Sequence, residues 1–407
     1  MIFSHAKGVC VRLAILAFLL LVAEIAAAAP LPDGSRMVFL GDSITEQCDY
    51  TRYVMDYFAL RYPDLNITFR NAGLGGGTAV EGLERLERDV LSQRPTVVTI
   101  CFGMNDGGCT TFEQERYEGF LAAMTRLVQT LKGRGIQVVL LTPGPVDEDR
   151  GLQGYNATLA RYAEGVIALA SQEQVAVCNI HTLMAKAQTQ AKQDNPQYTM
   201  IADSVHPDAP GHALMAYGLL LALGATEPAA SVSIDAVTGQ ITTDRATISD
   251  LTITSNAITF SRTDRALPTH FDPEAYSIFP YVPVQSTLDR YPFQVTGLSA
   301  GTWKLTVEGV EVGAFSADKL TEGVDLGTLP GPWQALGKQV DATVQVQEAI
   351  YLMRWKYLGV LLEVPKTAQP EKLALEQKLD QLIAEQEAAR RELTAPQALQ
   401  WSLTWVQ

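Results

Sequence analysis

Three short apolar segments near the start of the chain each lead directly into a loop of small and polar residues. These segments are Arg36–Leu40, Ile67–Arg70 and Thr96–Cys101. They alternate with helical patterns as far as Gly224, which predicts βαβ units and a parallel sheet covered by helices on both faces. Ligands of such sheets bind at the carboxyl ends of the strands, so we expect the three loops to meet at one site.

The first loop places a serine directly after a strand, and an acid and a histidine follow far downstream. Ser43 lies in Gly41-Asp42-Ser43, and Asp203 precedes His206 by three positions. A serine becomes a nucleophile when a histidine takes its proton and a carboxylate orients that histidine. Asp203 and His206 can both project from one short turn toward Ser43. The alternative is a serine that only caps a helix, and the other motifs make this interpretation less favoured.

The second and third loops can supply hydrogen-bond donors. The second reads Asn71-Ala72-Gly73-Leu74-Gly75-Gly76-Gly77-Thr78, and the third contains Asn105. Acyl transfer requires donors aimed at the oxygen on which negative charge develops. A glycine N–H and an asparagine side-chain amide are both suitable donors.

Together these segments resemble the GDSL, or SGNH, hydrolase family over roughly residues 36–224. The resemblance implies a three-layer α/β domain with a parallel sheet, with Ser43 as nucleophile, His206 as base and Asp203 as its partner. It also implies an oxyanion hole that includes Gly76 and Asn105. Many relatives carry an aspartate where Gly77 stands, which leaves the choice between Gly75 and Gly76 open. The implied substrates are O-acetyl or short acyl esters, with carbohydrate esters among them.

The remaining polar residues near these motifs are interpreted as structural. We expect Asp42 and Asp106 to hold their own loops, and His212 to be a structural or capping residue at the start of an apolar helix. His181 and His270 lie outside every motif. The sequence has no closely spaced His and Cys ligands, no phosphate-binding loop and no dinucleotide fingerprint, so we expect neither a metal nor another cofactor.

The N-terminal segment, residues 1–29, is typical of a signal peptide. Lys7 and Arg12 precede the apolar run Leu13–Val22, and small residues end the segment at Ala26–Ala29. The run is too short to span a bilayer, so we expect export and cleavage, a secreted or periplasmic protein, and no membrane span in the mature chain. An uncleaved anchor is the alternative. Removing the segment moves the net charge from −14 to about −15, which disfavours nucleic-acid and anionic-membrane partners.

Four cysteines remain after residue 29: Cys48, Cys101, Cys109 and Cys178. Export permits disulfides. Cys48 and Cys109 both follow strand ends near the expected site, so they form the more plausible pair. The other two lie in apolar runs.

The composition changes after Gly224, which suggests a second unit at 226–407 following the catalytic domain at 33–225. Segments within 231–260 and 293–315 alternate in the manner of half-buried strands, enough for a small β-sandwich. A helical hairpin is expected at about 333–393. Gln400–Val406 then places Trp401, Leu403 and Trp405 on one face, so we expect this terminal strand to pair with strands from 231–316.

The patterns favour a secreted serine esterase acting on a small ester or an acylated polysaccharide. Two alternatives stay open: an acyltransferase with the same site, and a non-catalytic carbohydrate-binding envelope protein on a hydrolase scaffold. The oligomeric state stays open as well. Hydrolysis of p-nitrophenyl acetate by the wild type and Ser43→Ala separates catalysis from binding alone.

Overall fold

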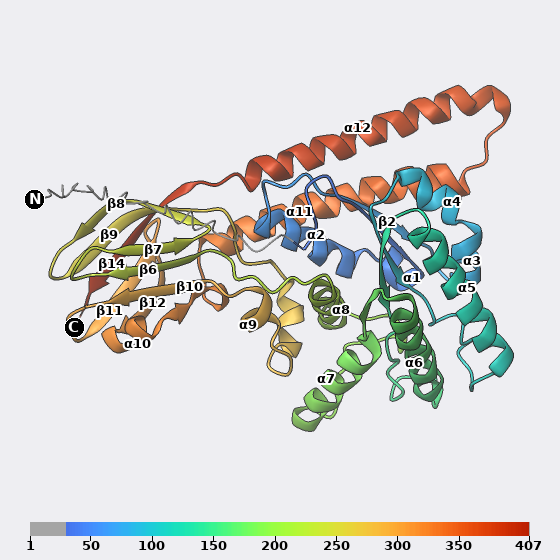
Figure 1. The fold of residues 1–407 in the computed structure, drawn as a ribbon, viewed down its shortest axis with the longest axis horizontal. Coiled ribbons are helices and arrows are strands. Elements are labelled where there is room, and N and C mark those ends of the chain that lie inside the picture. Colours follow the sequence, from blue (N-terminus) through green and yellow to red (C-terminus); the bar gives the residue numbers. More distant parts are fainter. Residues whose placement is uncertain (1–29, 407) are drawn as a thin grey trace, which may run out of the picture.

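The computed structural model describes residues 30–406, and the predicted signal peptide at residues 1–29 lies outside the described residues. An α/β domain forms one end of the molecule and a β-rich part forms the other (Figure 1). A pair of long helices runs along one side of the α/β domain. No helix within residues 30–406 has the length and apolar character needed to cross a membrane.

The α/β domain is built on five parallel strands in the order β2-β1-β3-β4-β5. They are β1 (Arg36–Gly41), β2 (Thr68–Gly73), β3 (Val97–Cys101), β4 (Gln137–Leu141) and β5 (Ala176–Cys178). Gly41 at the end of β1 is level with Gly73 of β2 and with Cys101 of β3. The loops after these strands therefore start at the same edge. The parallel sheet predicted from the alternating pattern is confirmed.

Helices cover both faces of this sheet. In β1, Met37 and Phe39 face one apolar core, while Val38 and Leu40 face the other. The first core receives side chains from α2, α7 and α8, and the second receives them from α3, α4 and α5. The helices are α1 (Ser43–Glu46), α2 (Asp49–Arg61), α3 (Ala79–Glu84), α4 (Leu86–Asp89), α5 (Gln114–Lys132), α6 (Tyr155–Glu173), α7 (Ile180–Asp194) and α8 (Ala209–Ala222).

The β-rich part consists of two sheets that enclose one apolar core. One sheet has the order β13-β10-β6-β7 and the other β12-β11-β14-β9-β8. The strands are β6 (Ser231–Asp235), β7 (Ile241–Asp244), β8 (Ala246–Ile253), β9 (Ala257–Asp264), β10 (Pro292–Thr296), β11 (Thr302–Val307), β12 (Val310–Ser316), β13 (Val324–Asp325) and β14 (Ala398–Trp405). The short helices α9 (Val284–Leu288) and α10 (Ala317–Glu322) connect strands.

The terminal strand β14 pairs antiparallel with both β9 and β11, as the alternation of its side chains predicts. Trp401 and Leu403 are buried in the core between the sheets. Trp405 is 41% exposed because it lies at the end of the strand, so only two of the three predicted anchors are buried.

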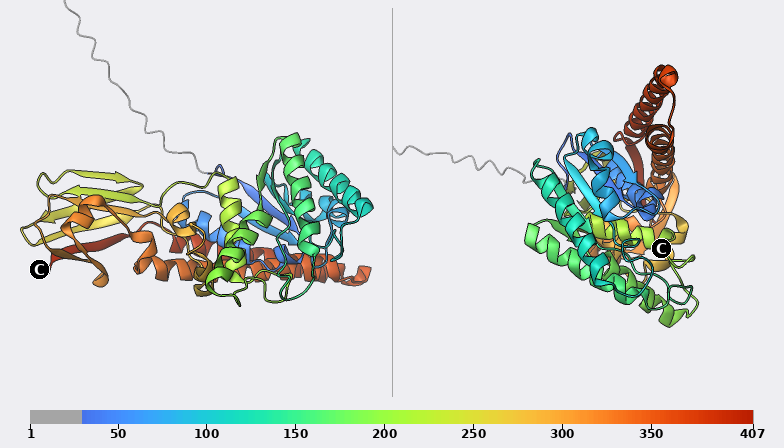
Figure 2. Two further views of the ribbon diagram at one scale, coloured as in Figure 1. Left: turned by 90° about the horizontal axis from the view of Figure 1, so that it is seen from below. Right: turned by 90° about the vertical axis from the view of Figure 1, so that its right-hand side faces the viewer.

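Residues 332–393, which we call the helical arm, lie against the α/β domain. The arm contains α11 (Pro332–Leu352), the π-helical segment η4 (Met353–Leu361) and α12 (Gln369–Leu393). Figure 2 shows both long helices passing along the α/β domain. Val344 of α11 joins one core of the parallel sheet, and Trp355 of η4 joins the other. The cores of the α/β domain are therefore completed by residues from the end of the chain.

The prediction of a Cys48–Cys109 disulfide is wrong, because all four cysteines among the described residues are free thiols. The Cys48 thiol donates to the carbonyl of Glu46 at 3.2 Å, within its own turn. Cys109 is exposed on the loop after β3. Proximity of two strand ends does not fix the direction of the side chains that follow them.

Candidate active site

The nucleophile candidate Ser43 is the first residue of the short helix α1, directly after β1. Asp42 caps this helix by accepting a hydrogen bond from the Ile44 N–H at 3.0 Å. Asp42 is buried, and burial raises its pKa to about 7. A side chain at Gly41 would place its Cβ 2.1 Å from Thr45 Oγ1, so only glycine allows the strand to turn this sharply into the helix. Ser43 is thereby held, half-buried, at the edge of the sheet.

The structure brings the predicted histidine and acid to this serine. His206 Nε2 lies 2.9 Å from Ser43 Oγ, and His206 Nδ1 lies 2.7 Å from Asp203 Oδ2. The other oxygen of Asp203 accepts the backbone N–H of His206 at 2.7 Å. Burial raises the pKa of Asp203, but these hydrogen bonds outweigh it and lower the pKa overall. The three side chains form one continuous chain of hydrogen bonds.

The histidine end of this chain is open to solvent. The side chain of His206 is 32% exposed and that of Asp203 is 58% exposed. The loop that carries them is fixed by Ser204, whose hydroxyl donates to the carbonyl of Asp147 at 3.2 Å. The histidine and the carboxylate are therefore accessible from solvent on a loop that is held in place.

The glycine-rich loop after β2 distinguishes between the two glycine candidates. Gly76 has a φ of +73°, a conformation that favours glycine, and it sits in a turn closed by a hydrogen bond from the Gly77 N–H to the Leu74 carbonyl. The Gly75 N–H donates to Glu46 Oε2 at 2.5 Å. Among residues 30–406, no acceptor is recorded for the Gly76 N–H. The free donor in this turn therefore belongs to Gly76.

Asn105 reaches the same loop from the end of β3. Its Nδ2 donates to the Gly77 carbonyl at 3.0 Å, which uses one of its two amide hydrogens. A Cβ placed on Gly77 would lie 3.9 Å from Asp42 Cα, so the loop lies beside the start of α1. Ser43, Gly76 and Asn105 thus come from three neighbouring strand ends and share one region.

Asp106 and His212 have the structural surroundings that the sequence suggested. Asp106 accepts the N–H groups of Ala79 at 2.8 Å and Gly103 at 2.9 Å, and burial raises its pKa to about 6. His212 is fully buried, lies parallel to the ring of Tyr50, and has its Nε2 3.2 Å from Gln47 Oε1. Burial lowers the pKa of His212 to about 3.

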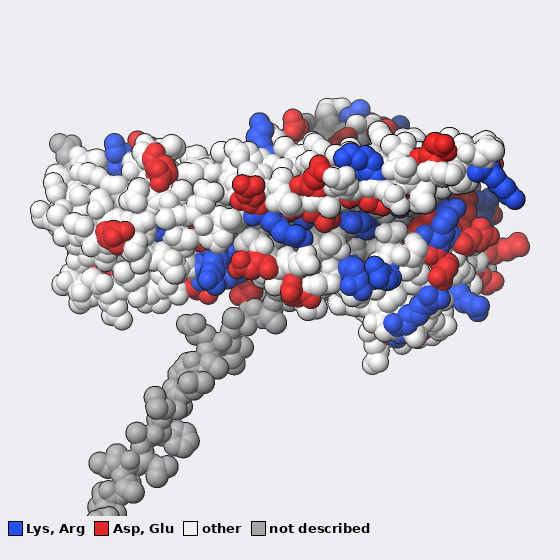
Figure 3. Space-filling model, turned by 90° about the horizontal axis from the view of Figure 1, so that it is seen from above, with Lys and Arg blue, Asp and Glu red and all other residues white. Residues whose placement is uncertain are grey.

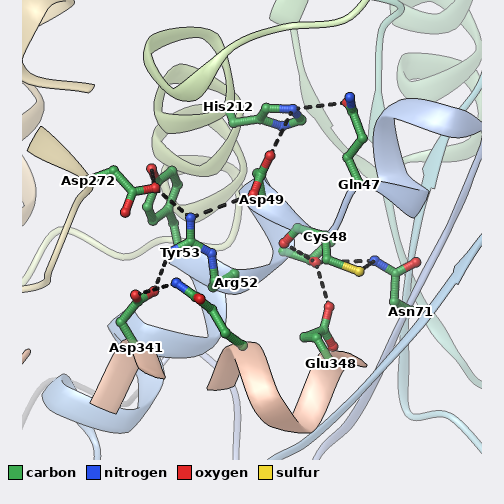
Figure 4. A network of polar contacts seen from close by, with 12 residues as sticks. Gln47, Cys48, Asp49, Arg52, Tyr53, Asn71, His212, Asp272, Asp341 and Glu348 are labelled. Carbon is green, nitrogen blue, oxygen red and sulfur yellow. Dashed lines mark hydrogen bonds and ion pairs between the residues drawn. The ribbon is translucent and has the colours of Figure 1, made fainter. Parts of the chain in front are cut away.

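A buried network behind α1 was missed in the sequence. Arg52 of α2 pairs with Asp272, at 2.6 Å, and with Asp341 of the helical arm. Thr51 donates to Glu348 of the arm at 3.1 Å. Figure 4 shows these arm carboxylates below α2, with His212 above it. The paired residues are hundreds of positions apart in the sequence, and no local sequence motif predicts that they pair.

One group of side chains in this network has the geometry of a possible cation site. Ligand atoms of His270, Asp272 and Asp341 lie within 4.8 Å of one another. Both carboxylates are already paired with the Arg52 guanidinium, which supplies positive charge between them. Asp272 and Asp341 therefore form an ion-pair cluster with Arg52. His270 lies beside this cluster and was assigned no role in the sequence analysis.

A second missed residue holds the strand ends that carry the site. Arg85 is buried and donates to the carbonyls of Ala72 at 2.7 Å and Gly41 at 2.8 Å. Asp89 lies 3.3 Å from Arg85 and also accepts the indole N–H of Trp355 at 3.1 Å. The ends of β1 and β2 are thus linked through two charged side chains to the helical arm.

A parallel α/β fold with a serine, a histidine and a carboxylate in one hydrogen-bonded chain at the carboxyl edge of its sheet places the protein in the class of hydrolytic α/β enzymes. Residues 39–214 match the model of the GDSL-like Lipase/Acylhydrolase family. Residues 39–214 therefore carry a domain of this GDSL/SGNH type, and the chain is a carboxylic ester hydrolase.

Two curated proteins are similar in sequence. An acetylxylan esterase of Geobacillus stearothermophilus is 25% identical over 218 residues, which cover 47% of this chain and 94% of that protein. The uncharacterized lipoprotein YqeF of Bacillus subtilis (strain 168) is 32% identical over 88 residues, covering 21% of this chain and 36% of that protein.

One solved structure shares the whole architecture. BT4096, described as a gut microbial diltiazem-metabolizing enzyme, superposes with a TM-score of 0.79 over 93% of this chain and 99% of its own. The two sequences are 23% identical, so this likeness concerns the fold. The combination of an α/β domain, a β-rich part and a helical arm therefore occurs in another protein.

Proposed function

We propose that the chain is an exported serine esterase that removes O-acetyl or short acyl groups, chiefly from carbohydrate. The observation that carries the proposal is the hydrogen-bonded series Ser43, His206 and Asp203, with 2.9 Å between Ser43 Oγ and His206 Nε2. That distance is within the range required for proton transfer between a nucleophile and its base.

The reaction proceeds in two steps through a covalent intermediate. Ser43 Oγ attacks the ester carbonyl while His206 Nε2 takes its proton, and the C–O bond to the alcohol then breaks as His206 returns the proton to the leaving oxygen. Water next attacks the acyl-enzyme as His206 takes its proton. The bond between the acyl carbon and Ser43 Oγ then breaks as His206 returns the proton to Ser43, which releases the carboxylic acid. Asp203 keeps the imidazole oriented in both steps.

Three donors are assigned to the oxyanion formed in each step. They are the backbone N–H groups of Ser43 and Gly76 and the free amide hydrogen of Asn105. Gly76 is preferred over Gly75 because the Gly75 N–H is occupied by Glu46. Such donors contribute mainly in the transition state and the tetrahedral intermediate, because the negative charge on the oxygen develops there and is absent from the bound ester.

The proposed substrate class rests on the relatives and on the openness of the site. The Geobacillus relative is an acetylxylan esterase. Exposure of His206 and Asp203 suits a substrate as large as a polysaccharide and gives water access to the acyl-enzyme. We favour hydrolysis over acyl transfer for this second reason.

The proposed organisation keeps the boundaries predicted from the sequence, with the helical arm packed back on the catalytic domain. A signal peptide at 1–29 exports the chain to the periplasm or beyond, residues 33–225 form the catalytic domain, and residues 226–407 form a β-sandwich with a helical hairpin at about 333–393. Figure 3 shows acidic and basic side chains interspersed over the helical portion and sparse over the β-rich portion of one face. No continuous basic surface is visible on that face for a nucleic-acid partner.

The test is acetate release from acetylated xylan and hydrolysis of p-nitrophenyl acetate, for the wild type and Ser43→Ala. We expect activity on both substrates in the wild type and a loss of several orders of magnitude in the variant. Ser92→Ala is the control, because Ser92 is exposed before the start of β3, at the opposite end of that strand from the site, and its hydroxyl donates to the Arg88 carbonyl at 2.6 Å. Wild-type hydrolysis by Ser43→Ala would overturn the proposal. Activity on the small ester alone would retain the esterase and reject the polysaccharide.

A further inference from the structure

The glycine loop that carries the proposed oxyanion donor has very few attachments to the rest of the protein. Gly75 and Gly76 are exposed and have no side chains with which to anchor the turn. Among residues 30–406, and beyond the hydrogen bond that closes the turn, two hydrogen bonds hold residues 75–77. Asn105 binds the Gly77 carbonyl, and Glu46 binds the Gly75 N–H. A glycine-rich turn loses much conformational entropy when it is ordered, so each attachment matters.

Glu46 connects this loop to the nucleophile. It belongs to the same short helix as Ser43, and its Oε2 accepts the Gly75 N–H at 2.5 Å. Strand β2 also approaches this helix closely, as shown at Gly73, where an added Cβ would lie only 2.2 Å from the Glu46 nitrogen. The carboxylate of Glu46 therefore fixes the distance between the Gly75–Gly76 backbone and α1.

The other oxygen of Glu46 is held from the far end of the chain. Lys356 in η4 of the helical arm forms an ion pair with Glu46 Oε1. The pair is largely shielded, since the side chains of Lys356 and Glu46 are 16% and 18% exposed. Removing one partner of a shielded pair leaves the other without compensation for its lost hydration. Glu46 without Lys356 would gain by turning toward water and away from Gly75.

Lys356 is in turn placed by its neighbour in η4. Trp355 is 4% exposed and inserts into a core of the parallel sheet, where its indole N–H donates to Asp89. This anchor fixes the point from which Lys356 reaches toward α1. The arm therefore contacts the proposed site through a defined series: Trp355, Lys356, Glu46 and Gly75.

We propose that Lys356 is a positioning residue for acyl transfer, which acts by holding Glu46 and, through it, the turn that presents the Gly76 N–H. This inference rests on the proposed esterase function of the site and goes beyond it by making the helical arm part of the oxyanion machinery. A mispositioned donor weakens stabilisation of the transition state more than ground-state binding. Loss of Lys356 therefore lowers kcat and leaves KM nearly unchanged.

The test compares four variants of the full chain. Lys356→Met removes the charge and keeps most of the stem, Lys356→Arg restores a cation, and Glu46→Gln removes the other charge. Arg354→Met is the matched control, because Arg354 lies two residues away and pairs with Asp380 of α12 at 2.9 Å, away from the loop. Two quantities are measured: turnover of p-nitrophenyl acetate, and amide hydrogen exchange of the peptide that contains residues 73–79.

For Lys356→Met we expect a kcat roughly tenfold lower, a KM within about twofold of the wild type, and faster exchange of the loop. Lys356→Arg recovers most of the turnover, Glu46→Gln changes both quantities in the same direction as Lys356→Met, and Arg354→Met matches the wild type in both. If Lys356→Met does not fold, Glu46→Gln decides the question. Wild-type turnover and exchange in the folded charge-removing variant, or an equal loss in Arg354→Met, would overturn the proposal.

Ser43→Ala in the same assay separates this inference from the proposed function. If Ser43→Ala hydrolyses the ester as fast as the wild type, the esterase assignment fails. The exchange measurement then still decides whether Lys356 orders the loop. If Ser43→Ala is inactive while the Lys356 and Glu46 variants match the wild type, the esterase assignment stands and the positioning role is rejected.

Discussion

The catalytic edge of the parallel sheet and the helical arm behind it are built in opposite ways. The edge consists of half-exposed side chains held by a few hydrogen bonds, such as Ser43 at the start of α1 and His206 on a loop. The arm presents buried side chains, such as Trp355 and Glu348, to helices and cores of the α/β domain. The proposed catalytic groups thus lie at the edge of the sheet, and the arm supplies side chains that stabilise the α/β domain. Substitutions at the edge should mainly change the reaction rate, and substitutions of buried arm residues should mainly change stability.

The sharpest contrast within the site is between its two histidines. His206→Ala removes the proposed base, so we expect the rate on p-nitrophenyl acetate to fall by about 10⁴-fold or more with little change in melting temperature. His212→Ala instead removes a buried ring, so we expect lower thermal stability and a much smaller loss of rate. Paired melting and rate measurements check this. A folded His212 variant as inactive as the His206 variant would show that the base is wrongly assigned.

A smaller effect on rate is expected for the proposed oxyanion donor. Asn105→Ala removes an amide that acts mainly on transition-state charge, so kcat should fall by about 10²–10³-fold while KM changes little. Steady-state kinetics on a soluble acetyl ester measures both constants. A raised KM with unchanged kcat would make Asn105 a substrate-binding residue and would remove it from the oxyanion hole.

Substituting a buried core residue of the arm should lower the free energy of unfolding more than it lowers the rate of the reaction. Trp355→Ala creates a cavity in a core of the parallel sheet and leaves Asp89 without its indole donor, at a cost of about 3–5 kcal/mol in unfolding free energy. Denaturant titration followed by both fluorescence and ester hydrolysis should show activity lost at lower denaturant.

Trp401→Ala is the control for this experiment, because Trp401 is buried in the core of the β-rich part. We expect that variant to lose stability in the β-rich part while activity persists to nearly the wild-type denaturant concentration. If Trp355→Ala left the activity midpoint unchanged and Trp401→Ala shifted it, the assignment of the arm as support for the α/β domain would be contradicted.

The smallest predicted effect concerns pH. Burial lowers the pKa of His212 from 6.5 to about 3, so the unfolded chain binds a proton at pH values where the folded protein does not. The stability contributed by neutral His212 is therefore fully present above pH 6.5 and is lost as the pH falls toward about 3. Melting temperatures between pH 7 and pH 4 should decline less steeply in His212→Gln than in the wild type. Identical slopes would exclude His212 as a source of acid sensitivity.

The sequence was most informative where chemistry dictates residue type. The sequence predicted that Ser43, Asp203 and His206 meet. A hydroxyl, a base and an acid in short motifs after strands are typical of a catalytic triad and have few other structural explanations. The repeated strand and helix pattern also predicted the parallel sheet, since both faces of each strand are apolar. The catalytic roles of these residues stay predictions until they are measured.

The sequence was least informative about partners far apart in the chain. An apolar stripe on α11 indicates that the helix is buried, but it does not say that the helix packs on α2. The pairs Lys356 with Glu46 and Arg52 with Asp341 have no local signature, because each member is an ordinary charged residue on a helix. The cysteine prediction failed for a related reason: nearness of backbone positions does not determine where the thiols point.

Covalent labelling of the nucleophile tests the central claim most directly. The wild-type chain is treated with a fluorophosphonate, which reacts with activated serines, and the modified residue is located by mass spectrometry. We predict one label on Ser43, with inhibition in proportion to labelling, no label in Ser43→Ala, and slow labelling in His206→Ala. Labelling of a different serine, or an unlabelled chain that hydrolyses esters at full rate, would contradict the assignment of Ser43 as the nucleophile.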